Sequence, residues 1–159
     1  MSKVLIPLAL GCEELEAITL IDLLRRAEIE VTTASLDDSP VKCSRNTIIV
    51  ADTTLDKVLN NDFDLMKRDR YVAAICAAPK VLLNNGILDG KNATAYPGSL
   101  DSMDTSGINL GKESIQVDGK VITSRGPGTA MDFALTLIET LEGLDTRNQV
   151  EAGLERQEP

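Results

Sequence analysis

Val72-Ala73-Ala74-Ile75-Cys76-Ala77-Ala78-Pro79 is the stretch that decides the fold of this chain. The four residues before Cys76 are apolar and three of them are small, which is too short a run for a helix but suits a strand buried on both faces. The residues that follow, as far as Leu83, are typical of the first turn of a helix. We therefore expect Cys76 at a strand-to-helix turn, which lifts its side chain out of the path of the backbone.

The position of Cys76 leaves two interpretations open. At such a turn the sulfur lies over the N-terminal end of the following helix, where unpaired N–H groups and the helix dipole favour the thiolate. A reactive cysteine can be made in this way without a metal. The alternative is a buried, inert cysteine in a strand of small residues, and the local sequence does not decide between the two.

The composition predicts a globular protein with an acidic surface. The chain has 159 residues, of which 43% are hydrophobic and 26% charged, and its net charge is −9. We expect one domain over residues 1–145, followed by a charged helix and tail over 146–159. The acidic balance argues against nucleic acid binding driven by electrostatics and against an anionic membrane surface as partner.

The start of the chain and its isolated cysteines lead us to expect a cytoplasmic protein. No apolar run is long enough to span a membrane, and the chain enters a strand at Lys3 without a long signal-type segment. Cys12, Cys43 and Cys76 are scattered singly, so the spacing suggests neither a disulfide framework nor a zinc site. We predict no metal and no cofactor.

The chain contains no histidine. Catalytic systems that depend on an imidazole, such as Cys-His pairs and Ser-His-Asp triads, are therefore excluded, and so are histidine-ligated metals. If Cys76 carries out chemistry, its partner must be a carboxylate, a tyrosine, a backbone group or water.

Strands and helices alternate along the chain, which indicates an α/β fold with a mostly parallel sheet. The Asp118-Gly119 pair predicts a type I′ hairpin turn. The expected strands cover residues 3–8, 29–35, 41–50 (as a pair), 63–65, 71–75, 93–96, 114–117 and 120–123. The expected helices start at Glu13 or Glu14, at Asp52 or Thr53 as N-cap, after Cys76, and at Thr129, the last of these ending at Gly143.

Glu16 is the acidic residue of interest in the first helix. We expect Glu13 and Glu14 to be solvated charges at the helix start, whereas Glu16 points to a different side of the helix. The sequence leaves two interpretations of Glu16: a functional carboxylate, or a charge that only complements the helix dipole.

The segment between Phe63 and Tyr71 is too short for the expected fold. Two parallel neighbouring strands need a crossover of a dozen or more residues, and only about five separate Leu65 from Tyr71 here. A strand, its loop and a returning helix, roughly 25 residues by typical element lengths, are missing.

Gly126-Pro127-Gly128 resembles a phosphate-binding loop only superficially. The spacing of established phosphate motifs is absent, and Pro127 removes one of the backbone donors that such a loop would use. We expect this loop to be structural and to fix the backbone beside the site.

Five stretches of the chain together resemble the DJ-1/ThiJ/PfpI superfamily, and within it the DJ-1/YajL-like branch. They span nearly the whole chain, and their joint occurrence in this order is far more specific than a single motif. The stretches are Ile6 to Ala17, Asp22 to Ala27, Val41 to Arg45, Val72 to Pro79 and Thr123 to Leu135.

This resemblance implies a flavodoxin-like three-layer sandwich that is commonly a homodimer. The family's functional cysteine falls on Cys76, and a family glutamate that hydrogen-bonds this cysteine falls on Glu16. The same resemblance implies that Cys43 and Arg45 lie near a dimer interface. The alternative, that Cys43 is an ordinary cysteine of an edge strand, has equal weight. The expected pocket residues are Ala77, Tyr96, Gly126 and Pro127.

Three positions bear on the branch and the activity. The family's strand ending in Pro-Gly-Gly, whose loop lines the cysteine pocket and would offer N–H groups to an oxyanion, is missing between Leu65 and Tyr71. Tyr96 stands where DJ-1-like members often carry histidine and YajL-like members an aromatic residue, so it fits the bacterial-type branch. Ala77 follows Cys76, which does not match the Cys-His pattern of PfpI-type peptidases.

The resemblance implies a cofactor-independent glyoxalase or protein deglycase. In this hypothesis the Cys76 thiolate attacks a 2-oxoaldehyde such as methylglyoxal, or its adduct on a protein, and Glu16 moves the proton. A second hypothesis is a redox sensor or chaperone in which Cys76 is oxidised without turnover. A third is an inactive remnant whose open sheet edge promotes aggregation.

Overall fold

The computed structural model describes residues 1–65 and 70–156. The chain forms two compact units, one made of Met1–Asp64 with Ala134–Pro159 and the other of Leu65–Phe133. Both units contain helices and parallel strand pairs, so the predicted α/β class is confirmed. The prediction of one domain over residues 1–145 stays a prediction.

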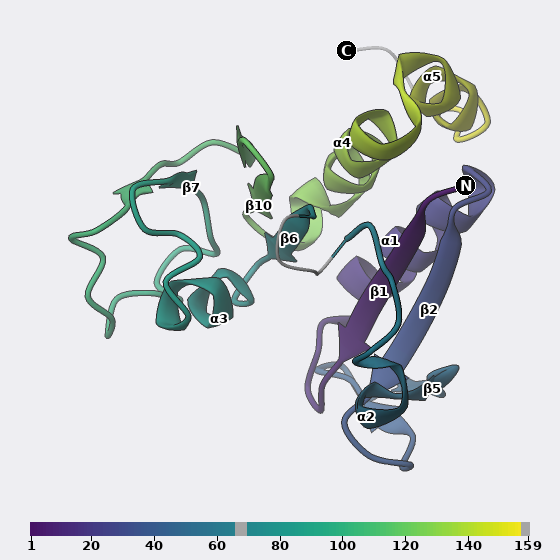
Figure 1. The fold of residues 1–159 in the computed structure, drawn as a ribbon, viewed down its shortest axis with the longest axis horizontal. Coiled ribbons are helices and arrows are strands. Elements are labelled where there is room, and N and C mark those ends of the chain that lie inside the picture. Colours follow the sequence, from purple (N-terminus) through teal and green to yellow (C-terminus); the bar gives the residue numbers. More distant parts are fainter. Residues whose placement is uncertain (66–69, 157–159) are drawn as a thin grey trace. The chain divides into compact units, whose positions relative to one another are not determined.

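The first unit is built on the parallel pair of β1 and β2 (Figure 1). The two strands are in register from Lys3 opposite Glu30 to Leu8 opposite Ser35, and β5 continues the sheet beyond β2. Its strands are β1 (Lys3–Leu8), β2 (Glu30–Ser35), β3 (Val41–Lys42), β4 (Ile48–Ile49) and β5 (Thr53–Thr54), and its helices are α1 (Glu14–Arg26), α2 (Leu55–Val58), most of α4 (Ala130–Glu142) and α5 (Leu144–Ala152).

The amphipathic pattern of α1 explains why this helix packs on the sheet. The helix buries Ala17, Leu20, Leu23 and Leu24 and contacts β2. Each fully buried leucine of this kind contributes roughly 1.5–3 kcal/mol from the removal of apolar surface from water. The predicted strand over 3–8 and the helix that follows it are therefore confirmed.

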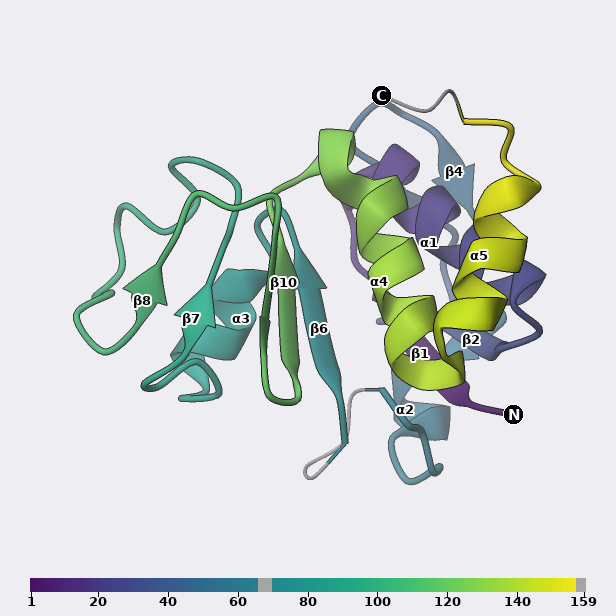
Figure 2. The ribbon, with the colours of Figure 1, turned by 90° about the horizontal axis from the view of Figure 1, so that it is seen from above.

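The second unit is built around β10, which pairs in parallel with β6 and antiparallel with β9 (Figure 2). This unit has its own core of buried apolar side chains, among them Leu82, Leu88 and Ile108. Its elements are β6 (Val72–Ile75), α3 (Pro79–Asn84), β7 (Asn92–Ala93), β8 (Asn109–Leu110), β9 (Ile115–Asp118), β10 (Val121–Ser124) and the 3-10 helix η1 (Pro127–Thr129).

Three local predictions were wrong in detail. The helix expected from Asp52 or Thr53 begins only at Leu55, because Thr53 and Thr54 pair with β2 as a strand. The strand expected over 93–96 is limited to β7, Asn92–Ala93. The hairpin loop is Gly119-Lys120, since Asp118 pairs with Val121; only Gly119 has a positive φ, a pattern typical of type II′ instead of the predicted type I′.

The short connection before β6 is only partly covered by the described residues. Phe63 and Leu65 are buried, and Leu65 forms an isolated parallel bridge with Tyr71, so the expected strand over 63–65 is reduced to one bridge. The part of the predicted gap at Met66 to Asp69 lies outside the described residues. Among the described strands, β1 pairs only with β2 and β6 pairs only with β10, so each lies at the edge of its own sheet.

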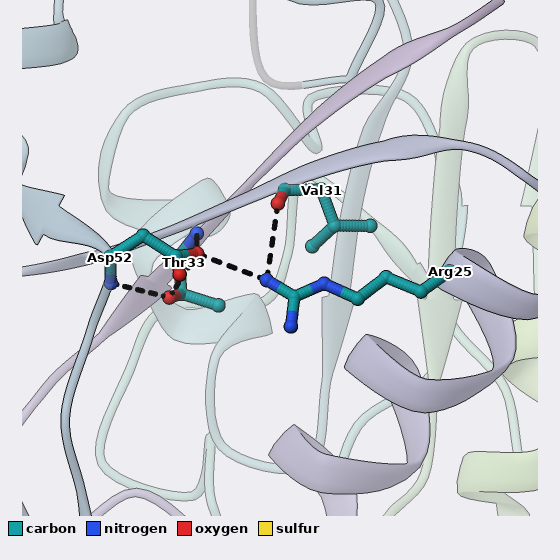
Figure 3. A network of polar contacts seen from close by, with 4 residues as sticks. All are labelled: Arg25, Val31, Thr33 and Asp52. Carbon is teal, nitrogen blue, oxygen red and sulfur yellow. Dashed lines mark hydrogen bonds and ion pairs between the residues drawn. The ribbon is translucent and has the colours of Figure 1, made fainter.

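Asp52 links β2 to the chain that leads into β5 (Figure 3). Its carboxylate accepts hydrogen bonds from the backbone N–H of Thr33 at 2.9 Å and from the Thr33 hydroxyl at 2.7 Å. The guanidinium of Arg25 lies 3.1 Å from the same carboxylate oxygen. This network explains why Asp52 is not available as a helix cap.

Candidate functional site

Cys76 lies at the strand-to-helix turn that the sequence predicts. It directly follows β6, its side chain is half-buried, and its φ is +62°, a left-handed conformation that non-glycine residues rarely adopt. Such a conformation costs of order 1–3 kcal/mol and persists only where the surroundings fix it. A strained backbone at a nucleophilic side chain is a feature that concentrates at functional sites.

Two backbone hydrogen bonds fix this conformation of Cys76. Its N–H donates to the carbonyl of Ser124 at 3.0 Å, and its carbonyl accepts from the N–H of Tyr96 at 2.8 Å. The bond to Ser124 continues the pairing of β6 with β10 by one residue, and the chain then turns away from β10. Cys76 is held from the two sides by segments that are distant in sequence.

The turn after Cys76 leads into a short helix. Pro79 occupies the start of α3, where the missing N–H of proline is not needed and its fixed φ suits a helix. The helix has six residues, so few peptide dipoles are aligned behind the turn. The strained elbow is therefore the feature that marks Cys76 most clearly.

The loop after β10 is closed by internal hydrogen bonds. The Thr129 hydroxyl accepts the N–H of Gly126 at 3.1 Å and lies 2.6 Å from the hydroxyl of Ser124. The N–H of Thr129 donates to the carbonyl of Gly126 at 2.9 Å, and Pro127 has no N–H. Because these donors are used or absent, the loop has the geometry of a structural brace, as expected, and not of a phosphate cradle.

The acidic residues at the start of α1 have different environments. Glu13 is the N-cap of α1, and its carboxylate accepts the N–H of Glu16 at 2.9 Å. Glu14 accepts hydrogen bonds from the hydroxyl of Ser44 and the backbone N–H groups of Arg45 and Thr47. Glu13 and Glu14 are thus charges at the helix start, as predicted, and each carboxylate also accepts specific hydrogen bonds.

The environment of Glu14 is reflected in its pKa. Partial desolvation acts to raise this pKa, but hydrogen bonds from the backbone N–H groups of Glu14 and Arg45, together with contacts to Thr47 and Ser44, lower it to about 2. Glu14 is thus an anionic anchor for the turn after β3. Sequence reasoning missed this role, since the partners lie some thirty residues further on.

Glu16 is buried, with 7% of its surface exposed, on the face of α1 that also buries Ala17 and Leu20. Buried carboxyl groups are rare in proteins and usually have a specific reason. Glu16 belongs to the first unit, whereas Cys76 belongs to the second. Their pairing remains a prediction from the resemblance.

The expected pocket residues all lie in the second unit. Ala77 follows Cys76 and is half-buried, Tyr96 is exposed and bonded to Cys76 through its backbone, Gly126 is buried and Pro127 is half-buried. Ser124 and Thr129 were not predicted as supporting residues, although two hydroxyl residues flanking a Gly-Pro-Gly loop are a recognisable signal for such a brace.

A hollow in the first unit is lined by residues including Ser35, Pro40, Asp52 and Lys57, and none of the predicted site residues borders it. In the part of the chain that the structure describes, no three acidic, cysteine or histidine side chains are grouped as metal ligands. Among those same residues, no helix has both the length and the apolar character needed to cross a membrane.

The comparisons with known proteins give long matches. The chain is 37% identical to protein dj-1beta of Drosophila melanogaster, covering 97% of each chain. It is 33% identical to the glutathione-independent glyoxalase DJR-1.2 of Caenorhabditis elegans, covering 87% of each. Among solved structures, Drosophila melanogaster DJ-1beta matches with a TM-score of 0.90 at 36% identity, over 99% of this chain and 100% of the other. Oxidized Toxoplasma gondii DJ-1 matches with a TM-score of 0.88 at 35% identity, over 97% and 98%.

The same comparisons support the predicted gap. The alignment to the Drosophila protein extends over 182 positions, whereas the chain has 159 residues, so the relative has positions without a counterpart here. The DJ-1/PfpI family matches in two segments, residues 2–66 and 64–140, which meet where the gap was expected. On the strength of these matches, this chain belongs to the DJ-1/PfpI family.

Proposed function

We propose that this protein is a cofactor-independent glyoxalase that converts 2-oxoaldehydes such as methylglyoxal to 2-hydroxy acids, with Cys76 as nucleophile. The observation that carries the proposal is the strained elbow at Cys76, with its φ of +62° and its two backbone hydrogen bonds. A relative with 33% identity is described as a glutathione-independent glyoxalase. The same chemistry would act on adducts of these aldehydes with proteins, a deglycase activity.

The proposed reaction begins at the sulfur of Cys76. The thiolate adds to the aldehyde carbon, a C–S bond forms, and the resulting oxyanion takes up a proton to give a hemithioacetal. A base removes the proton from this carbon and the neighbouring carbonyl carbon is protonated, which leaves a thioester of the 2-hydroxy acid. Water then cleaves the C–S bond, so the net change is the addition of one water molecule.

Glu16 is the proposed base for the proton transfer. A carboxylate suits this role because no histidine is present in the chain, and Glu16 is a buried carboxyl group in the first helix. The proposal requires that the carboxyl group of Glu16 reach the substrate carbon bound to Cys76. Ala77, Tyr96, Gly126 and Pro127 are proposed to border the substrate.

The proposal is tested by measuring methylglyoxal consumption and lactate formation without glutathione. Cys76→Ser is expected to lower the rate at least 100-fold, since the hydroxyl is a far weaker nucleophile without an activating base. Cys12→Ser serves as the matched control and is expected to retain the rate of the parent. Equal rates for Cys76→Ser and the parent would exclude Cys76 as nucleophile.

A second candidate function is redox sensing at Cys76 without turnover. One solved relative is described as oxidized DJ-1, which supports oxidation as a property within the family. This function needs only an accessible thiol and would tolerate the loss of the family's glycine loop. Peroxide titration with mass analysis of Cys76, combined with the methylglyoxal assay, separates the two: oxidation without turnover favours the sensor.

The remaining expectation concerns assembly. We propose a homodimer, as the resemblance implies, and small aldehydes or glycated proteins as the other partners. Sedimentation analysis of the purified protein tests the dimer directly, and a monomer at all concentrations would exclude it.

A further inference from the structure

Two cysteines that the proposed reaction does not use lie against each other in the first unit. The Sγ atoms of Cys12 and Cys43 are 3.6 Å apart, and both residues have free thiols. Cys12 is half-buried and Cys43 is buried, with 4% of its surface exposed. A disulfide requires an S–S distance of about 2.05 Å, so a small movement of the side chains would bring the two atoms to bonding distance.

The backbone holds these two cysteines opposite each other. On one side of the pair, the N–H of Gly11 donates to the carbonyl of Lys42 at 2.8 Å. On the other side, the N–H of Ser44 donates to the carbonyl of Cys12 at 2.9 Å. The loop after β1 is thus joined to the end of β3 by two hydrogen bonds that bracket the thiols.

The turn that carries Cys43 is itself fixed. The N–H of Cys43 donates to the carbonyl of Thr47 at 2.8 Å, and the Glu14 carboxylate accepts from Ser44, Arg45 and Thr47. Because both backbone segments are held in place, each thiol has the other as a neighbour of high effective concentration. This favours an intramolecular disulfide over reaction with a second molecule.

The surroundings keep the pair in the thiol form until an oxidant is present. Leu8, Ala17 and Val41 form the apolar cluster against which Cys12 packs. Burial, followed by the hydrogen bond and the charge of Cys43, raises the pKa of Cys12 to about 12. A raised pKa makes the thiolate of Cys12 scarce at neutral pH, which slows the first oxidation step.

We propose that Cys12 and Cys43 are a reversible oxidation site that forms an intramolecular disulfide with a hydroperoxide as oxidant. The thiolate of Cys12, the more exposed residue, attacks the hydroperoxide; the O–O bond breaks, an alcohol or water leaves, and Cys12 becomes a sulfenic acid. The thiolate of Cys43 then attacks this sulfur, the S–O bond breaks, and the oxygen leaves as water. Two thiols and one hydroperoxide give one disulfide, one alcohol or water, and one further water.

The test uses the parent protein and the Cys76→Ser variant, which retains only Cys12 and Cys43. Each is treated with hydrogen peroxide, alkylated and digested with trypsin, which cleaves after lysine and arginine. The expected product is a cross-link between the peptides Val4–Arg25 and Cys43–Arg45, with the loss of two hydrogen atoms and complete reversal by dithiothreitol. The oxidised protein is also expected to unfold at a higher temperature, since the cross-link constrains the unfolded chain.

Further variants sharpen this test. When Cys43→Ser is combined with Cys76→Ser, the sulfenic acid of Cys12 should accumulate and be trapped by dimedone, because no second thiol remains to resolve it. In Cys12→Ser, the cross-link should be absent. The proposal is overturned if both thiols stay reduced while the protein remains folded, if each is oxidised separately to sulfinic acid, or if the cross-links join two molecules.

Discussion

The carbonyl of Cys76 accepts a hydrogen bond from the N–H of Tyr96 at 2.8 Å. Tyr96 therefore supports the elbow through its backbone, whatever its side chain does. Tyr96→Pro removes this donor and is expected to destabilise the protein by about 1–2 kcal/mol and to lower the reactivity of Cys76. Tyr96→Phe keeps the N–H and should leave stability within about 0.5 kcal/mol. Urea unfolding and the rate of thiol alkylation measure both effects; equal stability of the two variants would refute the supporting role.

The left-handed backbone at Cys76 makes a prediction about stability alone. Cys76→Gly should be more stable than Cys76→Ala by about 1 kcal/mol, because glycine adopts a φ of +62° without strain. Cys76→Val should be less stable than Cys76→Ala, since a β-branched side chain fits this region worst. Thermal unfolding of the three variants gives the order, and an order with glycine lowest would contradict the strained elbow.

Glu16 is predicted to act in proton transfer. Glu16→Gln keeps the size and most hydrogen-bonding capacity of the side chain but cannot accept the proton, so kcat should fall about 10²–10⁴-fold with little change in KM. Glu13→Gln, at the start of the same helix, is the control and should retain kcat. Steady-state kinetics with methylglyoxal, on variants shown by circular dichroism to be folded, decide the matter; an unchanged kcat for Glu16→Gln would exclude it as the base.

Asp52 is predicted to make the free energy of unfolding depend on pH. Desolvation acts to raise its pKa, but hydrogen bonds from the N–H and hydroxyl of Thr33 and the charge of Arg25 lower the pKa below the ordinary 3.8. Because the folded-state pKa is the lower one, this carboxylate stabilises the fold above about pH 4, and the contribution is lost as the pH falls through the folded-state pKa.

The variant Asp52→Asn tests this dependence. At pH 7 it should lower the free energy of unfolding by about 1 kcal/mol, a modest figure because the Asp52 side chain is about half exposed, and at pH 3 the difference should shrink. Asp22→Asn removes an exposed pair with Arg26 one helical turn away and should cost less than about 0.5 kcal/mol at pH 7. Denaturant unfolding at both pH values provides the data; a constant difference would count against the carboxylate network.

The sequence predicted the features that local patterns determine. The apolar run at Lys3–Leu8, the period of α1 and the small-residue strand before Cys76 all form as expected, because each depends on neighbours in the chain. Asp52 was expected to cap a helix and instead binds Thr33 and Arg25, whose proximity arises only when β2 and β5 pair. Likewise, no spacing rule places Cys12 beside Cys43, since the contact joins two loops that are held together by backbone hydrogen bonds from Gly11 to Lys42 and from Ser44 to Cys12.

The order in which the second unit assembles follows from the position of β10. The two-residue loop Gly119-Lys120 joins β10 to β9, whereas β6 comes from much earlier in the chain. Closing this short loop costs less conformational entropy than bringing β6 to β10, so the hairpin of β9 and β10 should form first. β6 then pairs with the strand already in place. Cys76 bonds to Ser124, the last residue of that strand, and can adopt its strained turn only afterwards. The strained backbone at Cys76 should therefore be among the last features of this unit to form and among the first to be lost when it begins to unfold.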